Sequence, residues 1–202
     1  MGVHDAVNLG WKLAQVVRGQ SPHSLLDTYF AERHPVTART LRRTMASVAL
    51  RREDDRTGAL RDIVTELLSV QEARTRTAAE LSGLDIAYGL GGGHPVVGRR
   101  IPDLDLVIAG KGVRLYTLLQ AARPVFLDFG TGRFDIAPWA DRIVAAEAAC
   151  APEWDLPVIG TVTAPAAVLI RPDGHVAWAG DAADRGGLSE ALTAWVGAPH
   201  CG

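Results

Sequence analysis

The sequence predicts an α+β protein in which a helical segment, residues 1–85, is followed by an α/β domain, residues 86–202. Apolar residues recur at helical spacing through most of the first segment. In the second segment, short apolar runs of strand length alternate with helical patterns. The charge also differs: residues 1–80 carry 12 Lys and Arg against 10 Asp and Glu, whereas residues 81–202 carry 9 against 13. Together these observations favour two segments of different character.

The first helix is expected over residues 3–18, where the apolar residues follow a helical spacing. Asp5 falls in its first turn, where a carboxylate interacts favourably with the helix dipole. Gly19 favours a stop directly after it. Ser21 and Pro22 predict the start of a second helix, with Ser21 as the N-cap and Pro22 at the first helical position.

The rest of the helical segment, residues 36–82, contains two further helical stretches. The first covers residues 36–50, and Thr57-Gly58 predicts a break before the second. The second stretch repeats apolar residues at i, i+3, i+4, i+7 and i+8, which is the pattern of an amphipathic helix. These residues are Leu60, Ile63, Val64, Leu67 and Leu68. The nearby pairs Arg42-Arg43 and Arg51-Arg52 are predicted to be solvated helix faces and not a phosphate site, because Glu53-Asp54-Asp55 offsets their charge.

The second segment predicts strands and short helices in alternation, ending in a β-hairpin and a helix. The hairpin turn carries Asp173-Gly174, a strong short-range hairpin signal. Pro138 lies near the start of one expected helix, which suits the first helical turn. The expected elements are a strand at 104–108, a helix at 114–122, a strand at 124–129, a helix at 138–149, a strand at 156–159, hairpin strands at 166–170 and 175–178, and a helix at 188–196.

A strand–helix–strand unit followed by a hairpin and a helix is similar to the thioredoxin fold, so the second segment is expected to be a thioredoxin-like α/β domain. Ala164-Pro165 stands where thioredoxins carry a cis-proline. The redox chemistry is not expected to carry over, because thiol exchange needs a low-pKa thiolate and residues 130–137 contain no cysteine. The two cysteines, Cys150 and Cys201, are far apart and form no Cys-x-x-Cys motif.

Composition excludes several function classes. A net charge of −2 gives no general attraction to nucleic acid or to an anionic membrane. No apolar run reaches the roughly 18 residues that span a bilayer, and the N-terminus lacks a signal-peptide pattern, so a cytoplasmic location is expected. The six histidines are scattered without metal-ligand spacing, and there is no Gly-x-Ser-x-Gly motif. We therefore predict no metal site and assign no catalytic residue.

Three motifs resemble flavin-dependent aromatic hydroxylases of the para-hydroxybenzoate and phenol hydroxylase type. Residues 1–17 are similar to the sequence that closes the FAD-binding domain in that family, residues 25–35 to the helix that follows, and residues 171–178 to the family's C-terminal domain. Residues 94–106 give a weaker match. The matching positions are Gly2, Asp5, Ala6, Asn8, Leu9, Gly10, Trp11, Lys12 and Leu13, then Leu25, Leu26, Tyr29, Glu32, Arg33 and Pro35, then Arg171-Pro-Asp-Gly-His-Val-Ala-Trp178.

This resemblance implies the C-terminal part of an FAD-dependent aromatic or polyketide hydroxylase, without the N-terminal FAD-binding half. The Gly-rich run over residues 89–95 lacks the Gly-x-Gly-x-x-Gly turn of a dinucleotide site. The family uses FAD and NAD(P)H to hydroxylate an aromatic small molecule, and FAD would bind here only if the missing domain were supplied. Four residues would then lie beside the flavin: Met1, Gly2, Val3 and Asp5. A structural role is expected for Asn8, Trp11 and Lys12, and for Tyr29, Glu32 and Arg33 a role in packing this hairpin against the flavin domain.

Two functions remain open from the sequence. The first is a fragment or truncated homologue of an FAD- and NAD(P)H-dependent aromatic-ring monooxygenase, inactive alone. It would be either a truncated reading frame or a subunit that docks on a separate FAD-domain protein or pairs with a second copy. Apolar surface on the first two helices would then make the isolated chain self-associate. The alternative is a non-catalytic, thioredoxin-like interaction or dimerisation module.

Overall fold

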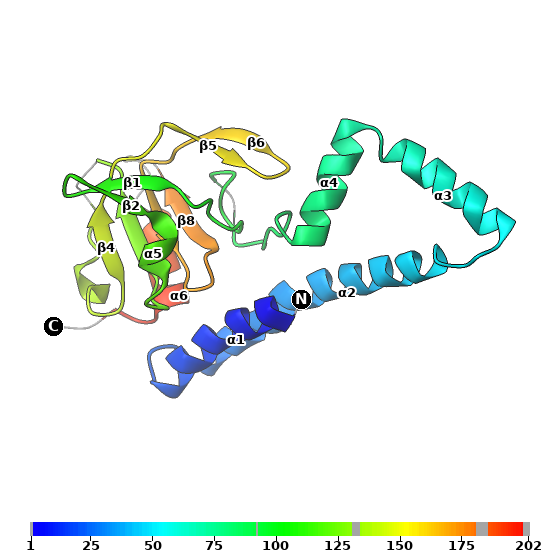
Figure 1. Ribbon diagram of the computed structural model, residues 1–202. Coiled ribbons are helices and arrows are strands. Elements are labelled where there is room, and N and C mark those ends of the chain that lie inside the picture. Colours follow the sequence, from blue (N-terminus) through cyan, green and yellow to red (C-terminus); the bar gives the residue numbers. More distant parts are fainter. Residues whose placement is uncertain (1, 92, 131–133, 181–185, 200–202) are drawn as a thin grey trace.

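The computed structural model describes residues 2–91, 93–130, 134–180 and 186–199. Within them, a helical region and a β-rich domain lie side by side, and an arm of helices extends away from the domain (Figure 1). The helices of the first region are α1 (Gly2–Val17), the short 3-10 helix η1 (His23–Leu26), α2 (Asp27–Ala49), α3 (Asp55–Leu67) and α4 (Gln71–Ser82). The described helices include none that is both long and apolar enough to cross a membrane.

The turn between α1 and α2 differs from the prediction in its capping. Gly19 adopts a left-handed φ of 68° after α1, which confirms the expected stop. Ser21, however, does not cap the next helix: its hydroxyl donates to Oε1 of Gln15 at 2.8 Å. Pro22 itself is the N-cap of η1, and α2 continues without interruption through Pro35. The buried Ser21–Gln15 hydrogen bond therefore fixes the α1–α2 turn in place of a side-chain cap.

The start of α3 corrects the predicted break at Thr57-Gly58. Both residues lie in the first turns of α3, and the break falls at residues 50–54. Asp54 is the N-cap, because its carboxylate accepts a hydrogen bond from the Thr57 backbone N–H at 3.0 Å. The Asp54–Thr57 pair therefore turns an apparent helix breaker into a helix start.

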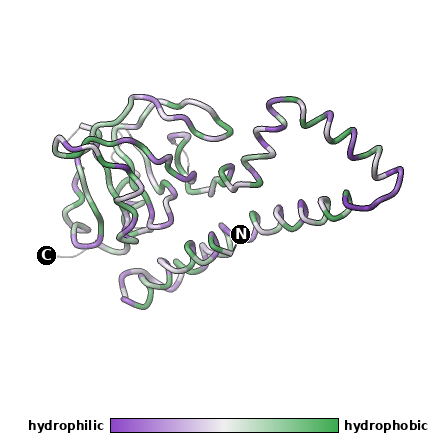
Figure 2. The backbone as a smooth tube through the Cα atoms, viewed as in Figure 1, coloured by the Kyte–Doolittle hydropathy of each residue, from purple (hydrophilic) through white to green (hydrophobic). Residues whose placement is uncertain are grey.

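The apolar stripe of α3 is not covered by the described chain. No residue of α3 is buried, and Leu60, Ile63 and Leu67 are each more than half exposed. We define the helical arm as α3, α4 and the second half of α2. Figure 2 shows hydrophobic positions distributed along this arm, away from the β-rich domain.

The β-rich domain is built on a four-stranded sheet of order β4-β3-β7-β8. Its strands are β3 (Val125–Asp128), β4 (Val144–Glu147), β7 (Ala167–Ile170) and β8 (Val176–Gly180). The β3–β4 pair is parallel, and the other two pairs are antiparallel. This order, closed by α6 (Gly186–Val196), is that of the thioredoxin fold, so the predicted α+β fold class is confirmed.

Two apolar clusters cover the two faces of this sheet. On one face, α6 supplies Leu188, Leu192 and Val196, which pack against Phe126 and Leu169. The opposite face is covered by segments that precede or interrupt the sheet. Its buried residues include Val96, Ile101, Leu106, Leu115, Val125, Leu127, Trp154, Val168 and Ile170. Since β3 and β7 are buried on both faces, their residues are apolar except for Asp128 at the end of β3.

Two predicted elements of the domain are wrong. The expected helix at 138–149 contains only the 3-10 helix η2 (Ala137–Trp139), and residues 144–147 form β4 beside β3. The strand expected at 156–159 is instead the end of β5 (Glu153–Leu156), which forms a hairpin with β6 (Gly160–Thr163). At residues 144–147 pairing with β3 overrides the local helical pattern. Residues 157–159 instead form the turn of the β5–β6 hairpin.

The other predicted elements of the domain are present with small differences. A strand at 104–108 appears as β1 (Asp105–Ile108), which pairs with the unpredicted β2 (Lys111–Arg114). The short helix that follows is α5 (Leu115–Leu119). The described residues contain no cis peptide bond, so Ala164-Pro165 does not share the cis-proline of thioredoxins.

Candidate functional site

The start of α1 is an open helix end beside a buried polar network. Met1 lies outside the described residues, whereas Gly2 and Val3 are exposed, Val3 by 75%. No heavy atom lies within 4 Å of the place where a Cβ on Gly2 would stand. The N–H groups of a first helical turn have no partner inside the helix. The first turn of α1 therefore presents an open, exposed helix end.

Asp5, in contrast, points into the structure. Its Oδ1 accepts from Nε of Arg33 at 2.7 Å, and the Arg33 side chain is only 3% exposed. Nη1 of Arg33 donates to the hydroxyl of Tyr88 at 3.1 Å. The Asp5–Arg33 pair therefore ties the first turn of α1 to α2, and Tyr88 anchors the same guanidinium to the segment that enters the β-rich domain.

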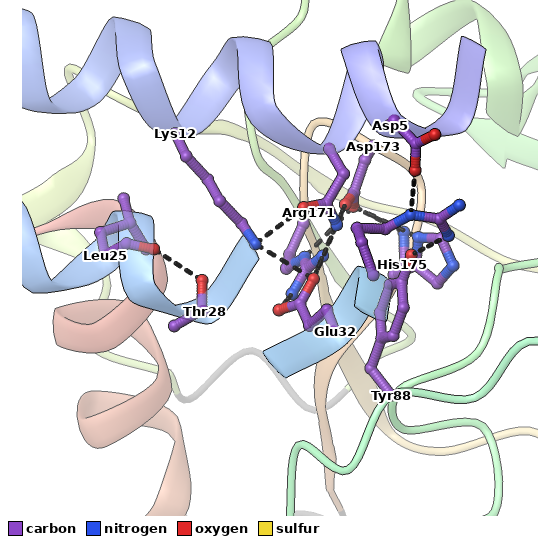
Figure 3. A network of polar contacts seen from close by, with 11 residues as sticks. Asp5, Lys12, Leu25, Thr28, Glu32, Tyr88, Arg171, Asp173 and His175 are labelled. Atoms are coloured by element: carbon purple, nitrogen blue, oxygen red, sulfur yellow. Dashed lines mark hydrogen bonds and ion pairs between the residues drawn. The ribbon is translucent and has the colours of Figure 1, made fainter. Parts of the chain in front are cut away.

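Glu32 is the centre of the buried network, shown in Figure 3. Its carboxylate accepts two hydrogen bonds from Arg171, at 2.7 and 2.9 Å. It also accepts from Nζ of Lys12 at 3.1 Å and from Nδ2 of Asn8 at 2.6 Å. Lys12 in turn donates to Oδ1 of Asn8 at 2.9 Å. One carboxylate thus joins α1, α2 and the turn between β7 and β8.

The β7–β8 turn brings Arg171 and Asp173 to this network. The Gly174 backbone N–H donates to the Arg171 carbonyl at 2.9 Å, and Gly174 has a φ of 79°, which favours glycine. Arg171 also donates to Asp173 through Nη2 at 2.5 Å and through Nε at 3.1 Å. The Asp-Gly signal therefore predicted the turn correctly, and the turn delivers one cation and one anion to the helices.

Aromatic rings surround the Arg171 guanidinium on several sides. Its Cζ lies 4.6 Å from the ring centroid of Trp195, 5.2 Å from that of Trp11 and 5.4 Å from that of Tyr88. Planar guanidinium groups stack well on aromatic faces and pair with carboxylates in a fork geometry, which lysine cannot do. Arg171 is 1% exposed, so both kinds of contact are desolvated.

The charges of the network perturb each other's pKa values. Burial lowers the pKa of Lys12 to about 8, against the opposing effect of Glu32. Burial alone would raise the pKa of Glu32, but the hydrogen bonds and charge of Arg171 hold it below its usual value. Burial would likewise raise the pKa of Asp173, and contacts with His175 and Arg171 outweigh it. Both carboxylates are therefore ionised at neutral pH and neutralise the buried cations.

Tyr88 reaches this site because the chain folds closely against itself. The Tyr88 backbone N–H donates to the Gly98 carbonyl at 2.9 Å. A Cβ at Gly98 would stand 1.9 Å from the Tyr88 carbonyl oxygen, and Gly98 has a φ of 79°. Only glycine fits there, so Gly98 holds Tyr88 against Arg33 and Arg171.

Sequence reasoning located some of these residues and missed others. It singled out Glu32 and Arg33 as pairing residues and Lys12 as structural, and all three are buried in the network. It expected the pairing to face a flavin domain, whereas the described partners of Glu32 include Arg171. Tyr88 carried no motif of its own. Among the described residues, no group of three or more His, Cys, Asp or Glu could hold a metal ion.

Two family models match the chain. Residues 94–199 match the C-terminal part of aromatic-ring hydroxylases, and residues 1–44 match an FAD-binding domain. Lys12 and Glu32 thus fall in the FAD-binding match, and Arg171 and Asp173 fall in the C-terminal match. The buried network is the junction between the two matched regions.

Curated relatives and a solved structure extend this likeness over nearly the whole chain. The chain is 42% identical over 205 residues to the 12-dehydrotetracycline 5-monooxygenase/anhydrotetracycline 6-monooxygenase of Streptomyces rimosus subsp. rimosus, covering 98% of this chain and 40% of the relative. It is 39% identical over 202 residues to rifampicin monooxygenase of Streptomyces venezuelae, covering 100% and 39%. BexE, studied for oxidation during BE-7585A biosynthesis, is 44% identical with a TM-score of 0.86, covering 99% and 41%. The chain thus spans about 40% of the length of these relatives.

Proposed function

Because the chain belongs to the aromatic-ring hydroxylase family, we propose that it acts as the C-terminal part of an FAD- and NAD(P)H-dependent monooxygenase. The substrate class that we propose is an aromatic small molecule of polyketide type, since the S. rimosus relative is named for tetracycline intermediates. FAD, when bound, would supply the oxygen chemistry. The residues of this chain would then orient the flavin and hold the domains together, and the chain alone would be inactive.

The observation that carries this proposal is the exposed face of α1. Val3, Val7, Leu13 and Val17 lie along one side of the helix and are 75%, 47%, 42% and 84% exposed. The opposite side of α1 carries Asn8 and Lys12, which are buried in the polar network. An apolar helix face held rigidly beside an open N-terminal turn is suited to packing against a flavin-binding domain.

The proposed flavin contacts are Met1, Gly2 and Val3, and we assign Asp5 a positioning role. The backbone N–H groups of the first turn would face negative charge on the ring. Asp5 is occupied by Arg33, so its contribution would be to fix the direction of α1 and not to touch the flavin. We retain the division into a helical tail of an FAD-binding domain, residues 1–85, and a thioredoxin-like domain, residues 86–202, as part of the proposal.

The proposed partner is a flavin-binding domain, either on a separate protein or shared with a second copy of this chain. We keep a cytoplasmic location as part of the proposal. A non-catalytic interaction or dimerisation module is the second candidate, and the half-exposed Leu60, Ile63 and Leu67 of α3 favour it. The two candidates differ in whether flavin is retained once a flavin domain is present.

Flavin retention tests the proposal. The chain would be co-expressed with the N-terminal part of the S. rimosus relative that precedes the matched region, and flavin absorbance would be recorded after gel filtration. We expect flavin in the complex and none with the chain alone. Val3→Glu should abolish the complex, whereas Leu81→Glu, an equal change at an exposed residue of α4, should preserve it. A complex without flavin would favour the interaction module, and equal loss with both variants would contradict the α1 surface.

A further inference from the structure

Arginines lie along α2 and just beyond its end. Arg39 and Arg43 are four residues apart on α2, and Ser47 continues the same face. Residues four apart lie one above the other on a helix, about 6 Å apart along the axis. Arg51 follows in the turn after α2, which ends at Ala49. All four residues line one cleft of about 560 Å³ between α2 and α4.

The inner end of this cleft is formed by His4 and Arg33. Arg33 is 2% exposed, and among the described residues its Nη2 has no hydrogen-bond partner, although Nε and Nη1 both do. Nη2 is therefore the nitrogen of Arg33 whose hydrogen bond no described residue satisfies. Burial and then the charge of Arg100 lower the pKa of His4, so arginines supply the positive charge of the cleft.

Carboxylates pair with three of the four arginines that line the cleft, and Arg51 is the exception among the described residues. Glu80 is the one acidic residue among those that line the cleft, and it pairs with Arg43. Arg39 pairs with Asp85 at 2.9 Å and Arg33 with Asp5 at 2.7 Å, both from outside the lining. The described chain provides no ion-pair partner for Arg51. The acidic run Glu53-Asp54-Asp55, which offsets the arginine pairs in the sequence, does not line the cleft.

We propose that this cleft binds the phosphate groups of a small phosphorylated ligand, with Arg43 and Arg51 as the principal contacts and Arg33 at the inner end. Guanidinium groups recognise phosphate through paired, charge-assisted hydrogen bonds. Two arginines one turn apart, Arg39 and Arg43, with Arg51 beyond the helix end, suit a ligand with two linked phosphates better than a single carboxylate. The ligand source is either a nucleotide or free pyrophosphate, and the site does not depend on flavin binding.

Calorimetric titration of the full chain with inorganic pyrophosphate and with ADP tests this site. We expect saturable binding of both, weakened by salt. Tighter binding of ADP would identify a nucleotide as the source, and equal binding would identify the phosphates alone. Arg43→Gln and Arg51→Gln should each weaken binding about tenfold, the effect of losing a charged hydrogen bond.

The controls separate a site from diffuse charge. Arg42→Gln and Arg52→Gln remove the same charge one residue away, outside the cleft lining, and should change binding less than about twofold. Glu80→Gln removes a competing carboxylate and should strengthen binding. If the Arg43–Glu80 pair only supports the structure, both Arg43→Gln and Glu80→Gln should weaken ligand binding. Absence of saturable binding by either probe, or equal effects at Arg42 and Arg43, would overturn the proposal.

Discussion

Arg171 and Glu32 are 139 residues apart in sequence and form a two-point ion pair, with Nη1–Oε1 at 2.7 Å and Nη2–Oε2 at 2.9 Å. Glu32 belongs to a long helix and Arg171 to a hairpin turn of the sheet domain. Because both side chains are buried, neither can exchange its partner for water. The two segments are therefore held together by a contact that tolerates little change in geometry.

Loss of Arg171 should destabilise the whole chain. Arg171→Met removes the cation that pairs with both Glu32 and Asp173 and leaves Lys12 as the remaining ion-pair partner of Glu32, so we expect a loss of about 3–5 kcal/mol in unfolding free energy. Urea unfolding followed by circular dichroism measures it. Arg114→Met is the matched control, since Arg114 pairs with Asp103 and Asp105 but is half exposed. Equal urea midpoints for both variants would contradict a structural role for the buried pair.

The lowered pKa of Lys12 predicts that the free energy of unfolding rises with pH on the alkaline side. Its pKa falls from the ordinary 10.5 to about 8 in the folded chain. Between these values the unfolded chain binds one more proton at this residue, so unfolding becomes less favourable as pH rises. Wild type should gain roughly 2–3 kcal/mol over Lys12→Met between about pH 8 and about pH 10.5. Subtracting the unfolding free energy of Lys12→Met from that of wild type removes the contribution of tyrosine titration, which both proteins share. If this difference stays constant across the pH window, the pKa of Lys12 is not lowered.

Helix α3 should open before the rest of the molecule. It has no buried residue, and an isolated helix of this length is marginal in water. Amide hydrogen exchange should therefore be fastest in α3 among the helices described. Asp54→Ala removes the N-cap and should speed exchange in α3 about fivefold, with no change in the urea midpoint. Asp62→Ala, in the middle of the same helix, is the control. Protection of α3 equal to that of α6 would show that something covers its apolar stripe.

In β3 and β7, which the sequence predicted correctly, consecutive residues are all buried. Residues 125–127 and 166–170 are apolar without interruption, and they lie in two strands that are buried on both faces. Residues 144–147 were missed as a strand because their side chains alternate between partial burial and exposure at a sheet edge. Alanine-rich edge strands carry a helical pattern that only the neighbouring strand overrides.

The site was predictable in part for a similar reason. Glu32 and Lys12 were singled out because they are charged positions of the two N-terminal motifs. Their positions on separate helices did not predict that the two side chains meet. Arg171 and Asp173 were recognised as a turn, since the signal of Asp-Gly is local. Their second task, neutralising charges on α1 and α2, depends on a tertiary contact that no local pattern encodes.

The late position of Arg171 has a consequence for synthesis on the ribosome. Lys12 and Glu32 are translated before their partner Arg171, which follows Glu32 by 139 residues. Until then the two helices cannot dock in their final arrangement, because the carboxylate at their centre lacks its guanidinium. A chain that stops before the β7–β8 turn would therefore keep a buried carboxylate without its guanidinium, which makes completion of that hairpin a requirement for the final packing of α1 and α2.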